Sequence, residues 1–363
     1  MSEDKNTISS TQFTFAVACF IQSATLLTPL TAGIVHHDTW LVAIFAAICY
    51  IPIAAILLFL IRRFPDKDLY DINEFVFGKI GGKIVSALYF FFFFLLTTLN
   101  IRDGGSFIQQ TIMNKTPVIM LLVSFVLLAI YSLQKGLQTV GKYSASFAFI
   151  NIAIVLFSFL AVAKIFNFEN LLPIMNSPPL SYVHGTNVMM TIPLGEMVCF
   201  LTFAPKVQRK TKGLSKQFFI GYAVGITTFV AVIIRDLGVL GNTIGYYALP
   251  SFETLKMAKL SSSIGHLEIL FAVALMIMFF FRIVLISYSF LLMLGKILNL
   301  KTFRPLIIST MSISLVYSLF IYKDRLIHMD LGARLAPVLW IFFEMFLPAV
   351  TLVIVLIRKK KSR

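Results

Sequence analysis

The feature of this sequence that most constrains its fold is a series of long apolar runs, each close to the length that crosses a lipid bilayer. A helix needs about 20 apolar residues to cross about 30 Å of hydrocarbon. A transmembrane β-barrel would instead alternate apolar and polar residues over about ten positions. The sequence therefore predicts an all-α integral membrane protein. The clearest runs are Leu41 to Ile61, Ile84 to Leu99, Ala145 to Ala163 and Leu335 to Ile357.

Composition supports this class, because 58% of the 363 residues are hydrophobic and only 13% are charged. A soluble domain of this size needs a more polar surface. The chain contains no GxxxxGK[ST], HExxH or GxSxG motif, so the sequence gives no support for an enzyme or an ATP-driven pump, and we expect no cofactor. Cys19, Cys49 and Cys199 stand singly in apolar segments, where we expect small core residues. The five histidines are expected in connecting segments, and no metal site is predicted.

Glycine, proline and charged clusters divide the chain into about ten predicted spans. Because five spans are an odd number, the second half enters the membrane from the opposite side. We expect one permease-like domain over residues 1–363, with a first repeat at about 12–166, a second at about 185–357 and a basic tail at 358–363. The predicted helices cover residues 12–35, 40–61, 83–111, 117–133, 143–166, 185–205, 217–240, 266–295, 304–322 and 334–357.

The distribution of lysine and arginine predicts the orientation of these spans. Most of the 31 basic residues fall in alternate connectors and at the two ends of the chain. Cytoplasmic loops carry such an excess, so both termini are expected in the cytoplasm. The net charge of +15 is explained in this way. Nucleic-acid binding would need a folded basic surface, and we do not expect it.

One predicted outer connector, from Ala248 to Ser263, alternates apolar residues with Lys256 and Lys259. This pattern is typical of an amphipathic helix that lies on a surface. It could cover an extracellular vestibule, or it could be a connector only.

Two predicted spans are interrupted at matching places in the two halves. The first contains Thr25, Leu26, Thr28 and Pro29, and the sixth contains Pro193, Leu194, Gly195 and Glu196. Broken helices are excluded from lipid contact, and paired breaks of this kind mark midplane binding sites in secondary transporters. Each proline could also simply kink its helix.

Charged residues inside predicted spans are costly and often functional. Arg282 and Glu344 each lie 14 residues from the inner boundary residues Lys296 and Arg358, about 21 Å along a helix. We therefore expect Arg282 to pair with Glu196 or Glu344. The pair could bind a zwitterion, relay a proton or lock two helices together. Tyr288 adds a hydroxyl group farther along the same helix.

Several short motifs, in their order and spacing, resemble the spore germination permeases, the B subunits of nutrient germinant receptors in the amino acid/polyamine/organocation transporter superfamily. The resemblance covers nearly the whole chain and ends at the terminal basic run. The first span departs from the glycine-rich break of many superfamily members, because Ser23, Ala24 and Thr25 stand there. The motifs are Ile8, Ser9 and Gln12, LLTP at Leu26 to Pro29, RD at Arg102, NKTP at Asn114 to Pro117, NLLP at Asn170 to Pro173, and PLGE at Pro193 to Glu196.

The resemblance implies a LeuT-like fold of ten helices in 5+5 inverted repeats, in the spore inner membrane. It implies a complex with a membrane A subunit and a lipoprotein C subunit, in which the permease subunit recognises a nutrient, commonly an amino acid, and helps to trigger ion release. The ligand site that it implies combines the two breaks with Asn100, Arg282 and Tyr288.

Three functions remain open at this point: a nutrient-sensing receptor subunit, an amino-acid permease coupled to H⁺ or Na⁺, and a membrane scaffold without a ligand.

Overall fold

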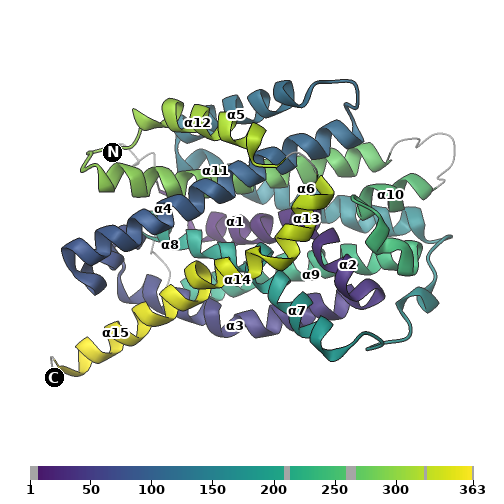
Figure 1. Ribbon diagram of the computed structural model, residues 1–363, viewed down its shortest axis with the longest axis horizontal. Helices are drawn as coiled ribbons and strands as arrows, with labels where there is room; N and C mark the ends of the chain where they lie inside the picture. Colours follow the sequence, from purple (N-terminus) through teal and green to yellow (C-terminus); the bar gives the residue numbers. More distant parts are fainter. Residues whose placement is uncertain (1–6, 208–212, 259–266, 323–324, 362–363) are drawn as a thin grey trace.

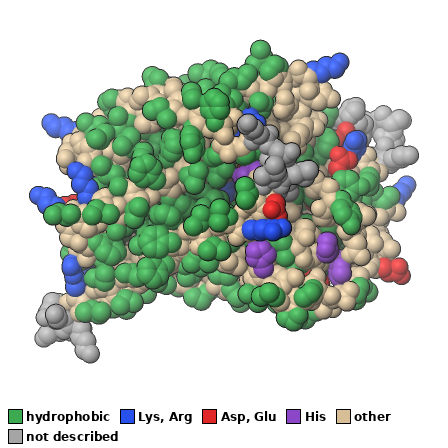
Figure 2. Space-filling model, viewed as in Figure 1, with side chains coloured by type: hydrophobic (Ala, Val, Ile, Leu, Met, Phe, Trp, Pro, Cys, Tyr) green, Lys and Arg blue, Asp and Glu red, His purple; other side chains and the backbone are tan. Residues whose placement is uncertain are grey.

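The computed structural model describes residues 7–207, 213–258, 267–322 and 325–361, and nearly all of them are helical. Among these residues, nine helices or helix pairs are long and apolar enough to cross a membrane, and the shorter apolar helix α12 adds a tenth span. Hydrophobic side chains cover the broad middle of the surface in Figure 2. The all-α, multi-span prediction is confirmed.

The first five spans follow the predicted order, and their ends are shifted by a few residues except at the start of the third. Span 1 consists of α1 (Ser10–Gln22), the 3₁₀ segment η1 (Ser23–Leu27) and α2 (Pro29–Val35), and the 3₁₀ turn η2 (His36–Asp38) joins it to the next helix. The following spans are α3 (Thr39–Arg63), α4 (Leu69–Thr111), α5 (Val118–Lys135) and α6 (Leu137–Val162).

The second half begins after the short 3₁₀ segment η3 (Phe168–Leu171). Span 6 consists of α7 (Pro179–Met189), the π-helical turn η4 (Met190–Leu194), the 3₁₀ segment η5 (Gly195–Cys199), α8 (Phe200–Phe203) and η6 (Ala204–Lys206). The next elements are α9 (Leu214–Leu240), η7 (Gly241–Tyr246), α10 (Pro250–Met257), α11 (Leu267–Ile297), α12 (Leu306–Phe320) and α13 (Arg325–Arg334). Span 10 consists of α14 (Ala336–Ile341), the π-helical turn η8 (Phe342–Phe346) and α15 (Leu347–Lys361).

The third helix begins much earlier than residue 83, where we expected it. Asp68 caps α4 and exchanges side-chain to backbone hydrogen bonds with Asp71, so the helix starts at Leu69. Gly78 then adopts a φ of 77°, which an L side chain rarely tolerates, and separates a first short helix from the membrane-crossing part. The polar residues after Leu99 continue this helix to Thr111, as predicted.

Two smaller predictions need correction, and a third is tested only in part. Cys49 is exposed on the apolar outside of α3, whereas Cys19 and Cys199 are buried as expected. His184 and His328 lie within α7 and α13 rather than in connectors. The predicted outer amphipathic helix is present as α10, and the remainder of that prediction, residues 259–263, lies outside the described residues.

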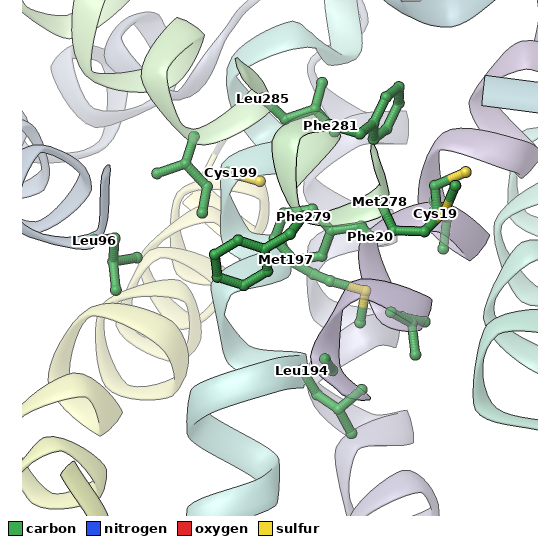
Figure 3. Packing of buried hydrophobic residues seen from close by; sticks show 14 of the residues in the cluster. Cys19, Phe20, Leu96, Leu194, Met197, Cys199, Met278, Phe279, Phe281 and Leu285 are labelled. Atoms are coloured by element: carbon green, nitrogen blue, oxygen red, sulfur yellow. The ribbon is translucent and has the colours of Figure 1, made fainter. Parts of the chain in front are cut away.

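The interrupted spans lie inside the bundle and not at its lipid-facing edge. In the most apolar stretch of span 6, 89% of the residues are buried, and in span 1 the share is 72%. Helix α11 packs along α4, and α1 packs along α9 (Figure 1). The break η1 contacts both α11 and α9, and η5 contacts α11. Figure 3 shows Phe20 of α1, Leu194 and Met197 of span 6 and Phe279 of α11 in the shared apolar core.

Candidate functional site: two broken helices joined by an arginine

The first break is produced by hydroxyl side chains and a proline. Ser23 Oγ donates to the carbonyl oxygen of Phe20 at 2.6 Å, and Thr25 Oγ1 donates to that of Gln22 at 3.0 Å. Such local bonds bend helices, and Pro29 has no N–H with which to continue the α-helical pattern. The chain therefore tightens to a 3₁₀ helix over Ser23–Leu27, at the place where the sequence predicted an interruption.

The second break is more extensive. Pro193 lies inside the π-helical turn Met190–Leu194, and the 3₁₀ segment Gly195–Cys199 follows immediately. A π-helical turn widens the helix and leaves carbonyl groups less regularly paired, and such turns are frequent at functional sites. Both breaks that the sequence predicted are therefore present, and both are buried.

Arg282 of α11 joins the two breaks. Its Nη2 lies 2.6 Å from Glu196 Oε2 and donates to the carbonyl oxygen of Ile192 at 2.9 Å. On the other side, Nη1 donates to the carbonyl oxygen of Phe20 at 3.4 Å and to Ser23 Oγ at 3.3 Å. The guanidinium carbon also lies 4.5 Å from the centre of the Phe20 ring. One fully buried cation thus holds a main-chain carbonyl group from each broken span.

The ion pair resolves the alternative that the sequence left open. Arg282 binds Glu196, and their side chains are 0% and 2% exposed. Glu344 does not take part. Its side chain is fully buried in η8, and neither carboxylate oxygen has a hydrogen-bond partner among the described residues.

The other predicted site residues are distributed around this ion pair. Thr25 and Leu26 line a small cavity next to Pro29. Thr28 is buried, and its Oγ1 has no hydrogen-bond partner within the described part of the chain. Asn100 is buried on α4 but donates its amide to Leu96 of the same helix at 2.7 Å.

Tyr288 lies six residues beyond Arg282, about 9 Å along α11. Its ring packs edge-on against Phe303 and Phe203, with centroid distances of 5.2 and 6.2 Å. The structure therefore does not bring it to the ion pair, and its role in binding stays a prediction.

The cavity at the first break is closed in this conformation. Its volume is about 10 Å³, and its wall includes Phe107 of α4, Phe271 and Leu275 of α11, and the segment from Leu249 to Phe252 at the start of α10. A cavity needs about 10 to 15 Å³ of such space to hold even one water. A nutrient could enter here only after α10 or a neighbouring segment moves.

A second buried ion pair holds α10 in place, and the sequence did not predict its partners. Arg235 and Asp236 are neighbours on α9, and Arg235 Nη2 lies 2.6 Å from Asp236 Oδ1. Arg235 donates to Ser158 of α6 at 2.7 Å, and Ser251 of α10 donates to Asp236 Oδ2. The cluster connects α10 to the spans α6 and α9. The adjacent charges were visible in the sequence, but the two serines gave no signal.

Asp38 is a further buried polar centre that sequence reasoning missed. It accepts hydrogen bonds from the Tyr182 hydroxyl group and from the backbone N–H groups of Met175 and Asn176, the latter two at 3.1 and 3.2 Å. This single carboxylate fixes the connector between the two halves to the end of span 1.

Among the described residues, no cluster of three or more His, Cys, Asp or Glu side chains is present.

The fold is that of LeuT-like transporters. The structure superimposes on MhsT in complex with L-phenylalanine with a TM-score of 0.59, at 11% sequence identity, and the match covers 95% of this chain and 98% of that one. It also matches the Eremococcus coleocola manganese transporter bound to an aromatic bis-isothiourea compound, with a TM-score of 0.58, 12% identity and coverage of 93% and 77%. At such low identity, these matches show a shared fold only.

The family follows from the sequence comparisons. A family model described as "Spore germination protein" matches residues 7–325. The chain is 22% identical to spore germination protein KB of Bacillus subtilis (strain 168) over 99% of this chain and 97% of that protein. It is 21% identical to spore germination protein A2 of the same organism, with 78% of each chain covered. The chain belongs to the spore germination permease family.

Proposed function

We propose that this chain is the membrane subunit of a spore nutrient germinant receptor and that it binds a small nutrient, such as an amino acid, between spans 1 and 6. The observation that carries this proposal is the contact of Arg282 with Glu196, with the carbonyl oxygen of Ile192 and with that of Phe20. A ligand placed between the breaks could bind these groups only by changing how the two spans are held.

This arrangement suits a sensor. A nutrient that binds more tightly when the breaks are apart would shift the protein from the closed conformation to an open one. The closed cavity at Thr25, Leu26 and Pro29 and the attachment of α10 through Ser251 are consistent with a resting state. A family of spore germination proteins is the context in which such a shift would act as a signal.

The location and partners are part of the same proposal. The chain would lie in the spore inner membrane with both termini in the cytoplasm, because the basic residues cluster on that side. It would assemble with a membrane A subunit and a lipoprotein C subunit, and those partners would carry the signal onward.

The test is a germination assay on spores that lack this gene. Single amino acids and other small nutrients are supplied one at a time, and the same spores complemented with the intact gene serve as the control. A defect confined to one nutrient class supports the proposal and names the ligand. Unchanged germination with every nutrient in a strain that lacks redundant receptors would contradict it.

An ion-coupled amino-acid permease is the alternative that the fold favours, because the fold is shared with a manganese transporter and with a protein in complex with an amino acid. Uptake of the identified nutrient into proteoliposomes separates the two functions. A receptor binds the nutrient without accumulating it, and a permease accumulates it.

A ligand-free scaffold remains as the third function, and site variants test it. If Glu196→Gln and Arg282→Ala proteins fold, assemble and support a normal nutrient response, the scaffold is favoured.

A further inference from the structure

The π-helical turn of span 10 places an acidic side chain in the centre of the bundle. Glu344 is the middle residue of η8 (Phe342–Phe346), and η8 packs against η5 of span 6. A methyl group added to Gly195 would lie only 2.1 Å from Glu344 Oε2, so the carboxyl group rests directly on the glycine of the second break. The absence of a side chain at Gly195 is what makes room for it.

Span 3 holds this turn in position. The Tyr89 hydroxyl group donates to the carbonyl oxygen of Phe343 at 2.8 Å, and the Phe92 ring stacks on that of Phe343 with centroids 4.6 Å apart. Contacts from α4 therefore stabilise the π-helical turn, and Glu344 points from this turn into the bundle.

The charges around Glu344 do not balance if it is ionised. The groups that face it are Tyr50 of α3, Tyr89 of α4, Glu196 of η5 and Arg282 of α11. The single cation already binds Glu196, and the Tyr50 hydroxyl group also has no hydrogen-bond partner within the described residues. An ionised carboxylate buried without a partner is very costly, so this site accommodates the neutral acid. If Glu344 is protonated, the negative charge of Glu196 and the positive charge of Arg282 cancel, and the group as a whole carries no net charge.

A metal cation is a poorer occupant than a proton. A hard cation requires several oxygen ligands around it. Here the other nearby carboxyl group, Glu196, is already bound by Arg282, and the described residues include no cluster of three or more His, Cys, Asp or Glu side chains.

We propose that Glu344 is a proton-binding site at the contact between spans 6 and 10. The carboxyl group holds its proton while η8 rests on Gly195. When the two segments separate and water enters, the O–H bond breaks, the electron pair stays on the carboxylate, and the proton passes to water. Opening of the second break thus releases a proton, whether the chain senses a nutrient or transports it.

Infrared spectroscopy of the purified full-length chain in lipid nanodiscs tests this proposal. At neutral pH the wild-type protein should show the carbonyl stretch of a protonated carboxyl group, and Glu344→Gln should lose the intensity of one such group per chain. The control Glu74→Gln, at a water-accessible carboxyl group, should not change the band. A wild-type spectrum without this band, or a band that Glu344→Gln leaves intact, overturns the proposal.

Two further variants test the geometry. Glutamine matches a neutral glutamic acid in shape, so the Glu344→Gln protein should fold and unfold like the wild type; failure to fold would mean that the ionised form is required and would refute the proton site. Gly195→Ala should displace the carboxyl group and shift its infrared band, whereas Gly33→Ala, with open space around the added methyl group, should not. An unshifted band in Gly195→Ala would contradict the proposed contact.

Discussion

Replacing Arg282 by methionine should strongly destabilise the protein, because it leaves Glu196 buried without its cation. Breaking a buried ion pair by removing one partner typically costs about 3 to 5 kcal/mol. The carbonyl oxygen of Ile192 also loses its donor, and the Phe20 ring loses the overlying guanidinium group. We expect Arg282→Met to lower the free energy of unfolding by about 4 kcal/mol.

A double variant at Arg282 and Glu196 separates the effect of the unpaired charge from that of lost packing. Adding Glu196→Gln to Arg282→Met removes the unpaired charge, and replacing both partners of a buried pair is often nearly neutral. The unpaired carbonyl groups remain, at a cost of about 1 to 3 kcal/mol. The double variant should therefore recover about 2 kcal/mol of the loss seen in Arg282→Met.

Unfolding by SDS in mixed micelles, followed by the fluorescence of Trp40 and Trp340, measures these free energies. Arg334→Met is the matched control, since Arg334 pairs with Asp330 at 2.8 Å but its side chain is 76% exposed. An exposed pair contributes about 0 to 1 kcal/mol. The reasoning is refuted if the Arg282 and Arg334 variants lose equal stability, or if the double variant is less stable than Arg282→Met alone.

Three further predictions concern the ends of the bundle. Tyr182→Phe removes the hydroxyl donor to Asp38 and should cost about 1.5 to 3 kcal/mol in the same SDS assay; a loss below the error of the assay would contradict the role of Asp38 as a buried centre. Ser251→Ala removes the link from α10 to the buried ion pair, so α10 should exchange its backbone hydrogens faster in a hydrogen-exchange experiment, and unchanged exchange would show that apolar packing alone holds it. Lys296 lies 2.6 Å from Asp68. Burial raises the pKa of Asp68, and the charge of Lys296 partly offsets this rise. Lys296→Gln should therefore raise the pKa of Asp68 further and lower the free energy of unfolding by about 1 kcal/mol. Because the pKa of Asp68 is then raised in the folded state, the deficit should be largest at neutral pH and shrink as the pH falls through that pKa; a deficit that does not depend on pH would contradict this explanation.

Most of the fold could be predicted from the sequence, because lipid imposes a simple rule on each span. A run of about 20 apolar residues must become a helix, and proline next to hydroxyl residues marks where that helix breaks. Both broken spans and the inward position of Arg282 followed from these rules. The early start of α4 did not follow from them, because the capping box at Asp68 lies well before the apolar run of this helix.

The site was only partly predictable, because pairing depends on distances between spans that are far apart in sequence. Glu344 lies at a depth similar to that of Arg282 and Glu196 lies in the sixth-span break, so the sequence left both as partners for Arg282. The structure pairs Arg282 with Glu196 and places Glu344 against Gly195. Tyr288 and Asn100 were chosen for their polar groups, yet the structure directs one toward aromatic rings and the other toward its own helix. The link between α10 and Asp236 depends on a serine, a residue too common to give a signal.

The most direct test of the account is nutrient binding to the purified full-length chain in lipid nanodiscs, measured as stabilisation against thermal unfolding across a panel of single amino acids and small nutrients. A ligand present at a hundred times its Kd should stabilise the protein by about 2.7 kcal/mol. The double variant Thr25→Val, Thr28→Val removes the hydroxyl groups of the two threonines at the first break without touching Ser23 or Arg282, and it should weaken binding about tenfold or more, while Thr243→Val in η7 should not. If no nutrient stabilises the chain, or if the double variant binds as tightly as the wild type, the two breaks do not form the ligand site.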